Sequence, residues 1–128
     1  MNLLLDTHAL LWFLADDPKL SANAKSAIEE PGNQRWLSPI SLLEIALKVR
    51  LDKLTLHARF ADLFPRQLYV NDIHLLPITE AHVEPLTTLA LHHRDPFDRL
   101  LASTAIVEAM TLVSADAVFE DYGLTRLW

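Results

Sequence analysis

Short apolar runs alternate with longer segments of helical spacing throughout this chain, and no other feature of the sequence restricts the fold more. The runs expected to form strands are residues 2–6, 34–38, 74–79, 111–115 and 124–128. Strands separated by helices favour a parallel sheet, because each parallel connection needs a crossover that a helix can supply. Only two glycines occur in the whole chain. The sequence therefore predicts an α/β sandwich with a mostly parallel central sheet.

The segments between these runs supply the helices. Helices are expected at residues 7–17, from Ser21 to near Pro31, and at 39–53, 58–71, 80–91, 96–110 and, as a short one, around 116–123. Pro65 is expected to break or restart the helix at 58–71, because proline lacks the N–H of an interior helical bond. Pro85 fits the helix at 80–91 poorly for the same reason. The 128 residues show no linker or repeat and are expected to form one domain, 1–128.

Composition excludes several classes of site. The chain contains no cysteine, which rules out disulfides, thiolate nucleophiles and cysteine-ligated metals and fits a location in the reducing cytoplasm. No stretch approaches the roughly 20 apolar residues of a membrane span, and the first apolar run lacks the features of a signal peptide. The formal net charge is −6. An acidic chain that handles nucleic acid must offset its own field, and bound metal ions are the obvious means.

Two aspartates follow predicted strands at equivalent places. Asp6 ends the first run, and Asp116 lies just after the run at 111–115. In open α/β sheets, ligands bind beyond the carboxyl ends of the strands, so these two acids can share one edge of the sheet. Each acid can instead serve only as the N-cap of the helix that follows it, a position where aspartate is preferred.

Two further acids lie on predicted helices. Glu44 is about 40° from Ile40 and about 60° from Leu47 around its helix, inside an apolar stripe. It is either a surface residue paired with Lys48 or a carboxylate that needs a partner in the interior. Asp98 shares its helix face with small residues, namely Ala102, Ala105 and Ala109. That face allows close packing, which would bring Asp98 toward the interior.

The stretch "HHRDPFDRLLASTA" holds a second aspartate, Asp95, directly before the predicted helix. Asp95 is expected to cap this helix, Pro96 suits its first position, and Asp98 can reach back as the third residue of a capping box. Asp95 is therefore mainly a cap, whereas Asp98 can both start the helix and hold a ligand.

Asp6, Glu44, Asp98 and Asp116 thus have reasons to meet at one site. Two carboxylates about 5 Å apart repel by roughly 3 kcal/mol at an effective dielectric constant near 20. A cluster of them persists only when protons or a cation neutralise it. Oxygen ligands of this kind suit Mg²⁺ or Mn²⁺, and such sites serve phosphoryl chemistry.

Four segments in this order carry a resemblance to a known family: "LLLDTHALLW", "SPISLLEIALK", "HHRDPFDRLLASTA" and "TLVSADAVFEDYG". Together they resemble the PIN-domain ribonucleases, and among these the VapC-type toxins of prokaryotic toxin–antitoxin pairs, over essentially the whole chain. The resemblance implies a three-layer α/β/α sandwich and a Mg²⁺- or Mn²⁺-dependent endoribonuclease. It also implies a homodimer, held inactive by a small VapB-type antitoxin whose C-terminal segment covers the active groove.

The acidic positions of the family correspond to the four acids already named. By the same resemblance, Asp95 is a possible further ligand, Thr7 a hydroxyl that can orient water or metal, and Ser114 the hydroxyl residue two positions before the last acid. Three basic residues flank the acids and are candidates for contacts with RNA phosphates, although solvated surface charge is the simpler interpretation of each. They are Lys48, Arg94 and Arg99.

Other interpretations remain open from the sequence. A haloacid-dehalogenase-type phosphatase needs a second aspartate two residues after the first, where this chain has His8. A receiver domain needs paired acids at the first strand. His92 and His93 suggest a metal-free ribonuclease, although both precede a helix cap and fit a loop equally well. A protein-binding module with a vestigial acidic site also fits the sequence.

Overall fold

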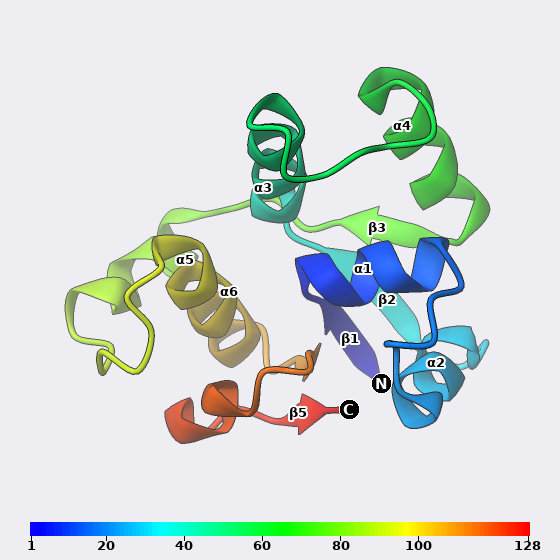
Figure 1. The fold of residues 1–128 in the computed structure, drawn as a ribbon. Coiled ribbons are helices and arrows are strands. Elements are labelled where there is room, and N and C mark those ends of the chain that lie inside the picture. The colour runs from blue at the N-terminus through cyan, green and yellow to red at the C-terminus, as the bar shows by residue number, and fades with distance from the viewer.

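The computed structural model describes all 128 residues and contains one five-stranded sheet (Figure 1). The strands are β1 (Asn2–Leu5), β2 (Gln34–Leu37), β3 (Ile73–Leu75), β4 (Thr111–Val113) and β5 (Arg126–Leu127). Their order in the sheet is β3-β2-β1-β4-β5, and every neighbouring pair is parallel. The predicted α/β architecture is therefore confirmed, with a sheet that is parallel throughout.

Six α-helices and two 3₁₀ segments connect the strands. They are α1 (Thr7–Leu14), α2 (Ala22–Glu29), α3 (Pro39–Arg50), α4 (Phe60–Val70), α5 (Glu80–Val83), η1 (Glu84–Thr87), α6 (Pro96–Val107) and η2 (Ala117–Tyr122). None of these helices is long and apolar enough to cross a membrane.

The apolar residues of β1 divide between two cores, because successive side chains of a strand point to opposite faces of the sheet. Leu3 and Leu5 pack with buried residues of α1, α2, α3 and α4. Leu4, between them, packs with residues of α6 and η2. Two helical layers thus cover the sheet, which confirms the three-layer sandwich, and Figure 1 shows α1 crossing in front of β1 and β2.

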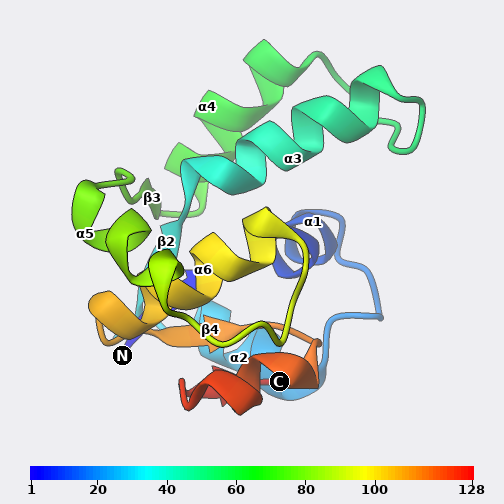
Figure 2. The ribbon, with the colours of Figure 1, turned by 90° about the vertical axis from the view of Figure 1, so that its left-hand side faces the viewer.

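Helix α3 joins the two layers at one end of the sheet. It contacts both α1 and α6, and Figure 2 shows it passing above them. Ser38 caps it with a side-chain oxygen 3.2 Å from the Ile40 backbone nitrogen, and Pro39 occupies its first turn. Because α3 follows β2 directly, it lies beside the carboxyl ends of the strands.

Pro65 does not interrupt its helix, so the break expected there is wrong. α4 runs from Phe60 to Val70 with Pro65 inside it. Proline at this place removes a single bond, to the carbonyl of Ala61 in the first turn. Leu63, Phe64 and Leu68 are buried in the core, and this burial holds the helix on the sheet.

Pro85, in contrast, ends an α-helix early. α5 stops at Val83, and the chain continues as the 3₁₀ segment η1 with Pro85 in its first turn. Residues 88–91 form no helix. The helix expected over 80–91 is therefore wrong beyond η1, because proline cannot donate the bond that would carry the α-helix forward.

Three helices end several residues before the expected boundary, at Leu14, Arg50 and Val107. Asp16, Asp52 and Ala109, each two residues beyond a helix end, adopt φ between 49° and 55°. The next backbone N–H then turns back to a carbonyl five residues earlier, as in Lys53 to Lys48 at 2.8 Å. This is the Schellman geometry that glycine usually provides. The chain forms it here without glycine, so no residue type in the sequence marks these helix ends.

Candidate active site

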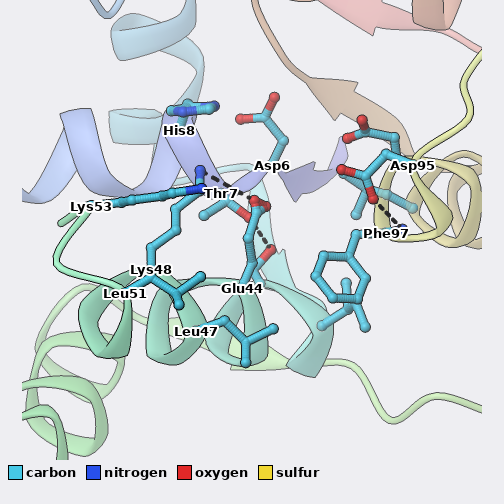
Figure 3. Close-up of a pocket in the computed structure, with 14 residues that line it drawn as sticks. Asp6, Thr7, His8, Glu44, Leu47, Lys48, Leu51, Lys53, Asp95 and Phe97 are labelled. Carbon is cyan, nitrogen blue, oxygen red and sulfur yellow. Dashed lines mark hydrogen bonds and ion pairs between the residues drawn. The ribbon is translucent and has the colours of Figure 1, made fainter.

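A pocket of about 320 Å³ lies where the strand order reverses, beyond the carboxyl end of β1 (Figure 3). Its walls come from the β1–α1 junction, from α3 and from the start of α6. Four acidic residues line it: Asp6, Glu44, Asp95 and Asp98. Such a switch point is where open α/β sheets bind ligands. The structure therefore brings three of the four predicted acids, and the accessory Asp95, to one pocket.

Asp6 caps α1 as the first residue after β1. Its Oδ1 accepts a hydrogen bond of 2.7 Å from the Ala9 backbone N–H. Burial raises the pKa of Asp6, while the Ser114 hydroxyl and this backbone bond favour the ionised form. Asp6 can be both a helix cap and a metal ligand, because the cap uses Oδ1 and leaves Oδ2 available to a ligand.

Ser114 connects Asp6 to the last predicted acid. Its side chain is fully buried, and its Oγ accepts a bond of 3.1 Å from the Asp116 backbone N–H. The same hydroxyl lowers the pKa of Asp6. Ser114 thus ties the ends of β1 and β4 together, a structural role beside the one that the resemblance implies.

Asp116 caps η2 and lies outside the residues that line the pocket. Its Oδ1 accepts from the Val118 N–H at 3.0 Å, and its Oδ2 is 2.7 Å from Nε2 of His93. Burial alone would raise the pKa of Asp116, but the hydrogen bonds from His93 and Val118 lower it overall. Asp116 therefore remains ionised beside the pocket.

Asp98, in the first turn of α6, has the most perturbed carboxyl group of the site. Its pKa rises to about 6, first through burial and then through the negative charge of Asp95. Glu44 and Asp116 raise the pKa further, and His93 opposes them. All these groups thus act electrostatically on the Asp98 carboxylate. The predicted cluster of acids therefore raises the pKa of Asp98, although burial contributes more to the rise than repulsion between the acids does.

Glu44 combines the two interpretations that the sequence left open. It forms an ion pair of 3.5 Å with Lys48, one turn along α3, and it also lines the pocket. Its side chain is 21 % exposed and that of Lys48 is 33 % exposed. Figure 3 shows both side chains on the same wall of the pocket.

Asp95 is the expected cap of α6. Its Oδ1 accepts from the Phe97 backbone N–H at 2.8 Å. The reciprocal bond from Asp98 back to Asp95, which would complete a capping box, is not formed, so that prediction is wrong. Asp98 instead lines the pocket, where it is half-buried and is repelled by the other acids.

Thr7 has a structural partner. Its hydroxyl donates a bond of 3.0 Å to Oγ of Ser41, and both side chains are buried. The bond joins the start of α1 to α3 across the pocket. The role of Thr7 in orienting water or metal remains a hypothesis beside this one.

The contacts of two residues were not foreseen from the sequence. His93, for which the sequence left open a loop position or a part in a metal-free ribonuclease, has a side chain only 10 % exposed that contacts Asp116. Arg99, proposed as an RNA contact, donates to the carbonyl oxygens of Leu86, Leu89 and Ala90. The terminal nitrogens of the Arg99 guanidinium are thus engaged in structural hydrogen bonds, which argues against the proposed RNA contact at Arg99.

The polar groups of this pocket can be compared with the ligands that a divalent cation needs. Carboxylate oxygens are the ligands that Mg²⁺ and Mn²⁺ prefer, and the raised pKa of Asp98 shows that the uncompensated charge is unfavourable. However, no three acidic or histidine side chains are close enough to hold one ion. The donor chemistry of the pocket fits a divalent cation, although its carboxylates are not gathered around a single point.

Fold and site together define a parallel α/β protein with an acidic pocket at the switch point of its sheet. The chain belongs to the PIN domain family, which its sequence matches over residues 3–124. No curated protein matches the sequence.

Several solved structures are similar to the chain over nearly its whole length. VapBC2 from Rickettsia felis, bound to a DNA fragment of its promoter, has a TM-score of 0.73 at 18 % identity, covering 98 % of this chain and 97 % of that chain. VapBC-1 from nontypeable Haemophilus influenzae has a TM-score of 0.68 at 16 % identity, covering 98 % and 96 %. FitAcB from Neisseria gonorrhoeae has a TM-score of 0.63 at 18 % identity, covering 97 % and 95 %. At these identities the likeness establishes the fold.

Proposed function

We propose that this chain is a divalent-metal-dependent endoribonuclease, the toxin of a type II toxin–antitoxin pair. The observation that carries the proposal is the acidic pocket at the switch point, where burial and neighbouring carboxylates raise the pKa of Asp98 to about 6. A cluster of this kind costs stability unless a cation neutralises it. Membership of the PIN domain family supports the same chemistry.

Asp6, Glu44, Asp98 and Asp116 are the residues that would hold Mg²⁺ or Mn²⁺. A bound ion would activate water and stabilise the leaving oxygen of a phosphodiester. The protein's own contribution is to fix its carboxylates: the N–H groups of Ala9 and Val118 each engage one oxygen, of Asp6 and Asp116 respectively. Because one oxygen of each carboxylate is held, the second oxygen of Asp6 and of Asp116 points in a defined direction.

Basic side chains beside the pocket would contact RNA phosphates. Lys48 lines the pocket on the same wall as Glu44 and is partly exposed, and Arg94 is exposed in the loop before α6. These two residues remain our candidates for RNA binding, since Arg99 is engaged with backbone carbonyls.

The surface of α3 supports an antitoxin partner. Leu43, Leu47 and Leu51 follow one another at helical spacing and are 47 %, 44 % and 61 % exposed. Leu47 and Leu51 also line the acidic pocket. An amphipathic segment with apolar residues on this ridge and a basic side chain in the pocket would match both features. We propose a VapB-type antitoxin as that partner, and a homodimer located in the cytoplasm.

The test is RNA cleavage by purified protein freed of any partner. Cleavage is expected with Mg²⁺ or Mn²⁺, to stop with EDTA, and to leave 5′-phosphate ends. Asp6→Asn and Asp98→Asn should each lower the rate at least ~10²-fold, as expected when electrostatic stabilisation at the reacting phosphate is lost. The exposed Asp121 offers a control, and Asp121→Asn should retain full activity. Undiminished cleavage in EDTA would contradict the metal-dependent reaction.

A non-catalytic binding module is the second candidate, because no three potential ligands lie within reach of one ion in this structure. Titration calorimetry separates the two proposals. The nuclease should bind Mn²⁺ in a manner that Asp98→Asn weakens. A binding module should show no such heat.

A further inference from the structure

A chain of hydrogen bonds runs from Tyr122 through His93 to Asp116. His93 lies in the loop before α6, and its ring is nearly buried. Its Nε2 is 2.7 Å from Oδ2 of Asp116, and its Nδ1 is 2.9 Å from the Tyr122 hydroxyl oxygen. The His93 backbone nitrogen also lies 2.9 Å from that oxygen.

These contacts determine where the protons are. The Asp116 carboxylate can only accept, so Nε2 of His93 carries a proton and donates to it. Nδ1 of the neutral imidazole is then an acceptor, and the Tyr122 hydroxyl donates to it while accepting from the His93 backbone N–H. The chain of bonds therefore selects the Nε2–H tautomer.

We propose that His93 is a positioning residue, held as the Nε2–H tautomer between Asp116 and Tyr122, that fixes the direction of the Asp116 carboxylate at the active site. This inference rests on the proposed function, in which Asp116 is a metal ligand. Val118 N–H holds the other oxygen of Asp116 at 3.0 Å. Held at both oxygens, the carboxylate cannot rotate freely. Hydrogen bonds of this kind orient metal ligands, and their loss typically costs 10–100-fold in affinity or activity.

Packing places the His93 ring for this task. The ring stacks on Tyr122 at an interplanar angle of 9°, with centroids 5.5 Å apart, and lies 4.6 Å from the ring of Phe119. The neighbouring His92 touches the same tyrosine edge-on but is exposed and makes no bond to an acid. His92 therefore provides a matched control, since it has the same ring and the same aromatic neighbour.

The tautomer can be measured without metal or RNA. In ¹⁵N-labelled protein, long-range proton–nitrogen correlation spectra distinguish Nδ1–H from Nε2–H. Wild type should show His93 as Nε2–H, and Tyr122→Phe should keep this tautomer because the Asp116 carboxylate still accepts from Nε2. An Nδ1–H tautomer in either protein would overturn the proposal.

Substitutions at His93 then test positioning. Leucine fills the space without a donor, whereas the amide nitrogen of glutamine can replace Nε2–H. His93→Leu should lower kcat for RNA by about 10–100-fold and weaken Mn²⁺ binding by a similar factor, with little change in KM. His93→Gln should recover most of both, and His92→Leu should change neither. Equal losses in the leucine and glutamine variants would mean that the ring only fills space.

The outcomes separate this inference from the proposed function. A wild type that cuts no RNA overturns the proposed function, and the Mn²⁺ titration then decides the role of His93. An active wild type with an equally active His93→Leu variant overturns positioning alone. If His93→Leu does not fold, the tautomer of wild-type His93 and the activity of His93→Gln still decide the matter.

Discussion

Removing the charge of Asp98 should stabilise the metal-free protein, although an acid in the first turn of a helix is ordinarily favourable. Asp98 lies at such a position in α6, where interaction with the helix dipole is worth about 0.3–1 kcal/mol. Its pKa is nevertheless raised from 3.8 to about 6. The folded state therefore disfavours the ionised form more than the helix end favours it.

The size and the pH range follow from this pKa. For a wholly buried group the rise would correspond to about 3 kcal/mol. Asp98 is half exposed, so solvent screening reduces the expected effect to about 1 kcal/mol. At a pH below 3.8 the Asp98 carboxyl is protonated in both the folded and the unfolded state, and it does not lower the free energy of unfolding. As pH rises through about 6 the carboxyl ionises in the folded state and the free energy of unfolding falls, because the folded state binds this proton more tightly than the unfolded state does.

The assay is thermal unfolding of wild type and Asp98→Asn in EDTA at pH 4 and pH 7.5. At pH 7.5 the variant should melt roughly 4 °C higher, the change that about 1 kcal/mol produces in a domain of this size. At pH 4 the difference should nearly vanish. Asp121→Asn, an exposed acid outside the pocket, controls for the change in net charge and should show no such pH dependence.

Adding Mg²⁺ at pH 7.5 completes the experiment. An ion present at about 100 times its Kd stabilises the folded state by about 2.7 kcal/mol. Wild type should gain in this way and Asp98→Asn much less. A variant that melts lower than wild type in EDTA at both pH values, with no effect of Mg²⁺ on either protein, would refute the reasoning. Asp98 would then be an ordinary first-turn acid.

Three further substitutions test individual contacts. Asp95→Ser should change the free energy of unfolding by no more than about 1 kcal/mol in chemical denaturation, since serine caps a helix well, and it should keep substantial RNase activity. A loss of activity equal to that of an Asp98 variant would mean that Asp95 is a metal ligand. Arg99→Ala should lower the free energy of unfolding by roughly 2–3 kcal/mol, because a charged donor to three carbonyl oxygens is lost, and an unchanged denaturation midpoint would contradict the role described for it. Ser114→Ala should cost roughly 1–2 kcal/mol by leaving the Asp116 N–H without its acceptor, and it should raise the pKa of Asp6 further, as measured by carboxyl NMR.

Features set by neighbouring residues could be predicted from the sequence. Alternating runs revealed the sheet, and Ser21 and Asp95 marked helix starts, because an N-cap acts within three residues. The meeting of Asp6, Glu44 and Asp98 at one pocket was also predictable. Asp6 follows from the rule that ligands bind beyond the carboxyl ends of parallel strands, Glu44 from its place in an apolar stripe, and Asp98 from the small residues on its helix face.

Features set by distant partners could not be predicted. The contacts of His93 are with Tyr122 and Asp116, 29 and 23 residues away, and its sequence context shows only a loop. Arg99 uses its charge on backbone carbonyls, which carry no mark in the sequence. The helix ends at Asp52 and Ala109 were missed because residues other than glycine adopt the left-handed conformation there.

The hydrogen bonds of Arg99 have a consequence for how soon the proposed enzyme becomes active after its partner leaves. Its guanidinium holds the carbonyls of Leu86, Leu89 and Ala90, and so anchors the loop that carries His93 and Asp95. A loop anchored in this way needs no folding step before the enzyme can work. In the proposed toxin–antitoxin pair, the lifetime of the complex alone would then set the time to the first RNA cut, with no further delay after the antitoxin leaves. Stopped-flow release of the partner would measure that delay as a single exponential without a lag.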